Sequence, residues 1–93
     1  MLKYNQYSKP YCLCDAEKFA YRIAVAEFRK RCINTDRTGD LEKRTVEDFE
    51  KCMNGMMRFQ FVGNVYMLIV HDIVNDEDMF GVNVCNETIV DTL

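Results

Sequence analysis

"MMRFQFVGNVYMLIVHD" (residues 56–72) is the most apolar stretch of the chain, and two folds are compatible with it. Gly63-Asn64 between two apolar runs is typical of a two-residue hairpin turn, and the α/β alternative places a hairpin at residues 57–71. The first run alternates apolar and polar residues as a strand does, but the second, residues 65–70, is apolar on both faces. Such a strand needs a neighbour on each side, and a lone hairpin supplies only one.

A helix accounts for the same stretch without a new start signal, because it can continue from a predicted N-cap at Thr45. In that helix the polar residues share one narrow stripe with a methionine: Gln60, Asn64, Met67 and His71. Gly55 and Gly63 would each cost about 1 kcal/mol relative to alanine, which is tolerable where a second helix packs closely. We therefore expect an all-α fold of antiparallel helical hairpins, similar to a HEAT array.

The rest of the chain fits the same organisation. Residues 1–14 form an aromatic-rich lead-in, and residues 15–93 form a helical, HEAT-like domain, complete or partial. The first helix is expected at residues 16–33 with Asp15 as its N-cap, and its apolar residues on two opposite sides predict packing partners on both. The elements expected after it are a loop at residues 34–44, the long second helix from Thr45, a turn at residues 75–83 and the start of a third helix at residues 84–93.

Composition indicates the compartment. The longest apolar runs fall short of the about 18–20 residues of a membrane span, and the first residues lack the apolar core of a secretory signal peptide. The five cysteines are an odd number and are expected to be reduced, buried thiols: Cys12, Cys14, Cys32, Cys52 and Cys85. We therefore predict a cytoplasmic protein.

Charge is unevenly distributed along the chain. All twelve Lys and Arg residues lie in residues 1–58, whereas residues 59–93 carry six acids and no base. A basic ridge on the first helix, with its neighbours, is a candidate contact for RNA phosphates or an acidic partner; the alternative is a solvated helix face. The ridge and its neighbours are Lys18, Arg22, Arg29, Lys30 and Arg31.

Three segments also suggest a family. They are "EFRKRC" (27–32), Arg58-Phe59 followed by "FVGNVYML" (61–68), and "GVNVCNETIVDTL" (81–93). In order and approximate spacing they resemble elements in successive helices of the middle domain of eukaryotic translation initiation factor 4 gamma. The resemblance implies HEAT-like helical hairpins and a non-enzymatic platform that binds an RNA helicase of the DEAD-box class, RNA, or other translation and decay factors. The chain is shorter than that domain and has Asn64 where an acid is usual, so it would be a divergent or truncated member.

The polar loop is a candidate calcium site, because Asn34, Asp36, Thr38 and Asp40 occupy positions 1, 3, 5 and 7 of a calcium-binding pattern. Position 12 is Thr45, which cannot supply the bidentate carboxylate that completes such a shell. The cysteines offer a single tight pair, with the wrong spacing for a zinc site. His71 has no identifiable nucleophile beside it, and catalytic motifs are absent from the sequence.

These observations predict a non-enzymatic protein that needs no cofactor. Its expected role is a protein-binding scaffold or adaptor in translation or messenger-RNA metabolism, with a protein partner such as a DEAD-box helicase, and with RNA as a further candidate. Two alternatives remain. One is a degenerate EF-hand-like calcium-binding module, and the other is a small structural subunit that completes its core with a partner in a large assembly.

Overall fold

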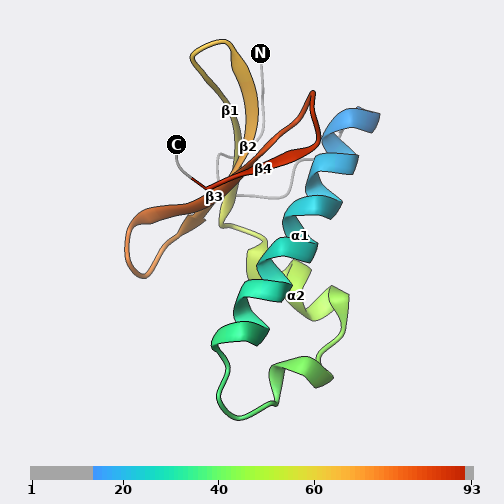
Figure 1. The fold of residues 1–93 in the computed structure, drawn as a ribbon, viewed down its shortest axis with the longest axis vertical. Coiled ribbons are helices and arrows are strands. Elements are labelled where there is room, and N and C mark those ends of the chain that lie inside the picture. Colours follow the sequence, from blue (N-terminus) through green and yellow to red (C-terminus); the bar gives the residue numbers. More distant parts are fainter. Residues whose placement is uncertain (1–13, 92–93) are drawn as a thin grey trace.

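The computed structural model describes residues 14–91 and shows an α+β fold, so the predicted all-α, HEAT-like fold is wrong (Figure 1). Most of the predicted lead-in, residues 1–14, lies outside the described part. The helices are α1 (Asp15–Thr35), the short 3-10 helix η1 (Leu41–Lys43) and α2 (Val46–Met53). They are followed by an antiparallel sheet in which strand order equals chain order: β1 (Met57–Val62), β2 (Val65–Asp72), β3 (Glu77–Asn83) and β4 (Thr88–Val90).

Gly63-Asn64 reverses the chain between β1 and β2, as the hairpin alternative for residues 57–71 requires. The strands pair from Met57↔Val70 at the base to Val62↔Val65 beside the turn. Gly63 has φ +61°, which glycine adopts freely and which an α-helix excludes. Glycine with positive φ at the first central position is the pattern of a type II′ hairpin turn. Gly63, which was expected only to destabilise the continuous helix, therefore excludes it.

The strand β2 has the two neighbours that its apolar sequence demands. It pairs with β1 on one side and with β3 on the other, from Met67↔Asn83 to Asp72↔Glu77. The predicted turn at residues 75–83 is wrong, because most of that segment is β3. The second neighbour of β2 is thus β3, a strand whose own sequence is largely polar and contains a glycine.

A tight turn and a short strand replace the predicted third helix at residues 84–93. Asn83 organises this turn, because its side-chain oxygen accepts hydrogen bonds from the backbone N–H groups of Cys85 (3.0 Å) and Asn86 (3.1 Å). Glu87 adopts a left-handed φ of +57°, and the chain then pairs with β3 as β4. The third helix was therefore a wrong prediction within the described residues.

Both predicted helix starts are close to the observed ones. Helix α1 begins at Asp15, one residue before the expected position, and Cys14 is its N-cap in place of Asp15. Thr45 caps α2 as predicted: its hydroxyl accepts from the backbone N–H of Asp48, and the Asp48 carboxylate accepts from the Thr45 N–H, both at 3.2 Å. Helix α2 ends after Met53 because Gly55 follows with φ +100°.

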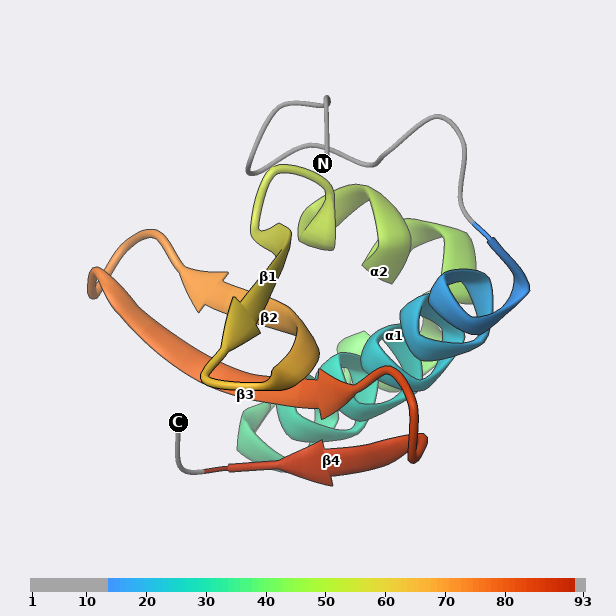
Figure 2. The ribbon, with the colours of Figure 1, turned by 90° about the horizontal axis from the view of Figure 1, so that it is seen from above.

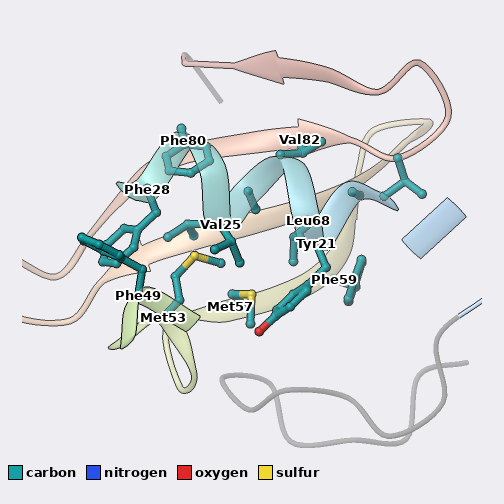
Figure 3. Packing of buried hydrophobic residues seen from close by; sticks show 14 residues of the cluster. Tyr21, Val25, Phe28, Phe49, Met53, Met57, Phe59, Leu68, Phe80 and Val82 are labelled. Carbon is teal, nitrogen blue, oxygen red and sulfur yellow. The ribbon is translucent and has the colours of Figure 1, made fainter. Parts of the chain in front are cut away.

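The core lies between one face of the sheet and the two helices (Figures 2 and 3). Helix α1 contributes Ala20, Ala24, Val25 and Phe28 to it, whereas Phe19, on the expected second apolar side, is 46% exposed. Ile23, on the same side as Phe19, is partly buried against the core, so the expected second side is covered only in part. The buried side chains that face it come from α2, from the sheet and from the residue after β3: Phe49, Met53, Met57, Phe59, Leu68, Val70, Phe80, Val82 and Val84.

Candidate functional site

The tip of the β1–β2 hairpin carries three exposed apolar side chains. Phe61 is 66% exposed, Val62 37% and Val65 39%, and the three flank the Gly63-Asn64 turn. In Figure 1 this hairpin extends upward, away from α2. Residues 59–70 contain no charged side chain. We call Phe61, Val62 and Val65 the hairpin tip; it is the candidate functional site.

Phe61 is held in place although it is exposed. Its ring lies against Tyr66, its cross-strand partner, with centroids 4.9 Å apart, and the Tyr66 ring stacks on Phe59 at 5.7 Å. Phe59 is buried in the core. The Tyr66 hydroxyl donates a 2.6 Å hydrogen bond to Glu17 Oε2 in the first turn of α1. Cross-strand aromatic contacts of this kind restrict the rings. The exposed Phe61 ring is therefore presented by a chain of contacts that starts in the core.

A polar cluster occupies the opposite face of the sheet. The Arg58 guanidinium donates two hydrogen bonds to the Asp78 carboxylate, at 3.1 and 3.2 Å. The ring of His71 lies between two carboxylates, with Nδ1 2.8 Å from Asp78 Oδ1 and Nε2 3.1 Å from Asp76 Oδ1. The hydrogen bond with Asp78 is the main cause that raises the pKa of His71. Burial would raise the pKa of Asp78, but the bonds from Arg58 and His71 outweigh it and lower that pKa.

The residues of the predicted basic ridge have two kinds of surroundings. Lys18, Arg22 and Lys30 are exposed, whereas the Arg29 guanidinium lies 5.7 Å from the Phe49 ring centroid. Arg31 is bound within the fold: it pairs with Glu27 at 2.7 Å and with Asp91, and it lies over the Phe80 ring. Residues 15–54, the helical part, contain nine basic and nine acidic side chains. The net charge of this part is therefore zero, and RNA binding at the ridge stays a prediction.

The candidate calcium residues build a capped turn. Asn34 is still in α1, and the Asp36 carboxylate accepts from the backbone N–H groups of Thr38 (3.0 Å) and Leu41 (2.9 Å), which help to lower the pKa of Asp36. The Thr38 hydroxyl in turn accepts from the Asp40 N–H at 3.2 Å. Within residues 14–91 there is no group of three or more His, Cys, Asp or Glu side chains placed to hold a metal ion. Calcium binding stays a prediction, and the oxygens of Asp36 already face other donors.

The cysteines are mostly at the surface. Cys14, Cys52 and Cys85 are exposed and free, and Cys32 is partly buried beside the core. Buried thiols were therefore a wrong prediction for three of these positions, and Cys12 lies outside the described residues. Between residues 14 and 91, neither helix combines the length and the apolar character that a membrane span requires.

Comparisons with family models, with curated proteins and with solved structures find no match to this chain. Its function must therefore be argued from its own geometry. The hairpin tip was missed from the sequence because the helical interpretation dispersed Phe61 and Tyr66 over a long apolar side. The signal was present, since Phe59 and Phe61 alternate with polar residues directly before the turn glycine.

Proposed function

We propose that this chain is a protein-binding module that docks through its hairpin tip. The single observation that carries the proposal is Phe61, which is 66% exposed and yet fixed by its contact with Tyr66. Rigid, exposed aromatic side chains are typical anchors of protein interfaces, because they bury a large apolar area with little loss of conformational entropy. The role is non-enzymatic, and we place it in the cytoplasm, where the free thiols would remain reduced.

The chemistry of the tip favours a protein partner over RNA. Phosphate recognition needs clustered Lys or Arg side chains, and residues 59–70 contain none. An uncharged apolar tip instead fits an apolar pocket or groove on a partner surface. A DEAD-box helicase partner and a role in translation were implied by a helical fold that this chain does not have, so they form no part of the proposal.

A small subunit of a larger assembly, the alternative hypothesis, could also dock through such a tip. The behaviour of the isolated chain distinguishes an independent module from such a subunit. Size-exclusion chromatography of a module gives a folded monomer. A chain that requires a partner to complete its core aggregates or unfolds in isolation.

The proposal is tested by quantitative capture from a lysate treated with nuclease. Bait proteins are wild type, Phe61→Ser and the control Val74→Ser, whose residue is 92% exposed on the β2–β3 turn. We expect Phe61→Ser to weaken capture of the partner about 30-fold, the effect of a hot-spot residue worth about 2 kcal/mol, and Val74→Ser to leave it unchanged. Equal capture by all three folded baits contradicts the proposal.

A photo-crosslinking amino acid at position 61 identifies the contact directly. The crosslinked partner should be the protein that Phe61→Ser loses, and the same amino acid at position 74 should not crosslink to it. Crosslinking only from position 74 would assign the interface to the other hairpin.

A further inference from the structure

A β-bulge places His71 opposite Asp78. Strands β2 and β3 pair as Val70↔Phe80, and the register then shifts so that His71 faces Asp78. Regular pairing would set Met79 opposite His71 and would turn Asp78 toward the other face, because side chains alternate along a strand. The bulge therefore brings an imidazole and a carboxylate together on the face of the sheet away from the helices.

Both nitrogens of the His71 ring lie within hydrogen-bond distance of a carboxylate oxygen, Asp78 at Nδ1 and Asp76 at Nε2. Only the protonated ring carries two N–H donors. In the neutral ring, one nitrogen presents a lone pair to a carboxylate oxygen, which is repulsive. The arrangement is therefore complementary to the imidazolium form of His71.

The two contacts are unequal. The Asp78 side chain is 31% exposed and is also held by Arg58, whereas the Asp76 side chain is 92% exposed. The contact of Nδ1 with Asp78 is the shorter and better shielded one, so Nδ1 keeps its proton to a higher pH. Nε2 therefore loses its proton first. Asp76 has φ +53°, a left-handed backbone that asparagine and aspartate tolerate better than most residues. A residue with strained backbone thus depends on the weaker of the two contacts.

We propose that His71 is a proton-controlled latch: its imidazolium holds Asp76 against strand β2, and loss of the Nε2 proton releases Asp76 and the end of the β2–β3 turn. Among the described residues, the other charged groups around this ring are Asp72 from β2 itself and Arg58 from β1, which binds Asp78. Asp72 caps the start of the turn independently, because its Oδ1 accepts from the N–H groups of Val74 and Asn75. Release is therefore confined to the end of the turn.

The direction of the pH effect follows from the raised pKa of His71, whose usual value is 6.5. Because the folded protein binds this proton more tightly than the unfolded chain, the contribution to stability is complete below pH 6.5. It is lost as the pH rises through the folded value. The latch is closed in acid and opens on the alkaline side of 6.5.

His71 is the only histidine of the chain, so one imidazole signal reports the latch. Proton–nitrogen correlation spectra across pH give its midpoint and its tautomer. We expect a midpoint above 6.5, a neutral ring that keeps its proton on Nδ1, and an Asp76 amide that shifts with the same midpoint. The amides of Val74 and Asn75 should shift much less, since Asp72 holds them.

Two variants that each remove one negative charge distinguish a direct contact between Asp76 and His71 from a general electrostatic effect on His71. Asp76→Asn removes the carboxylate at Nε2 and keeps a residue that tolerates positive φ, whereas Glu77→Gln removes an exposed neighbouring charge. We expect Asp76→Asn to lower the His71 midpoint by more than twice the shift caused by Glu77→Gln. A wild-type midpoint at or below 6.5, equal shifts in the two variants, a neutral ring protonated on Nε2 or an invariant Asp76 amide each overturns the proposal. None of these outcomes affects the hairpin tip, which lies at the other end of β2.

Discussion

The Tyr66 hydroxyl donates a 2.6 Å hydrogen bond to Glu17 Oε2 and so joins strand β2 to the first turn of α1. The other oxygen of the same carboxylate, Oε1, accepts from the backbone N–H of Cys14 at 3.0 Å. Burial of Glu17 would raise its pKa, but the bonds from Tyr66 and Cys14 outweigh burial and lower it. One ionised carboxylate therefore connects the start of α1 to the aromatic pair that presents Phe61.

Replacement of Tyr66 by phenylalanine tests this connection. The buried Glu17 carboxylate loses a donor, and we expect the free energy of unfolding to fall by about 1.5–3 kcal/mol. The lowered pKa of Glu17 means that its stabilisation is present above pH 4.5 and is lost as the pH falls through the folded value. Urea denaturation of both proteins should therefore show a large difference at pH 7 that narrows in acid. A difference that is the same at every pH would contradict the role assigned to Glu17.

Gly63→Ala tests the turn, and the sign of its effect distinguishes the two folds. A Cβ at Gly63 meets no atom within 4 Å, so the cost is backbone strain alone, about 1–2 kcal/mol at φ +61°. In a continuous helix the same substitution would stabilise the protein by about 1 kcal/mol. Chemical denaturation measures the difference. Asn64→Ala, at the neighbouring turn residue, serves as the control and should change stability by less.

Arg31→Met should weaken the attachment of β4 to α1. Arg31 pairs with Glu27 and with Asp91, which directly follows β4, and its guanidinium lies 4.6 Å from the Phe80 ring centroid. We expect a loss of about 1 kcal/mol and faster hydrogen exchange of the β4 amides. The adjacent Lys30 is exposed, and Lys30→Met should stay within about 0.5 kcal/mol of wild type. Equal exchange in the two variants would show that Arg31 does not hold the strand.

Met53→Ala should be the most destabilising of these changes. Met53 is fully buried where α2 meets the sheet (Figure 3), so truncation leaves a cavity and costs about 2–5 kcal/mol. Thermal and urea unfolding give the value. Val46→Ala on the same helix, at a residue that is 55% exposed, should change stability little. Comparable losses at both positions would mean that α2 is not packed as described.

Local signals in the sequence identified the two helix starts and the polar loop between the helices. Thr45 is followed by acids that satisfy a helix start, and the side chains involved lie within three residues of one another, so no distant partner is needed to recognise it. The polar turn organised by Asp36 is also local, because its backbone donors lie within five residues of it. Strand β3 has no local signal of this kind. It can be recognised only through its pairing with β2, and that pairing requires that β2 is already known to be a strand. Of the candidate site, the turn glycine was recognisable, whereas the Phe61–Tyr66 contact required the register.

The sequence by itself determined where the helices begin, where the chain is polar, and that a glycine separates two apolar runs, because each of these depends on neighbouring residues. Only the tertiary structure decided that the apolar run after Gly63 is a central strand. Residues 65–70 carry enough apolar side chains for a buried helix or for a central strand with a paired strand on each side. The choice depends on whether a third segment forms backbone hydrogen bonds along the second edge of this strand. Glu77–Asn83 supplies it, and the left-handed φ of Gly63 allows the chain to turn toward that arrangement.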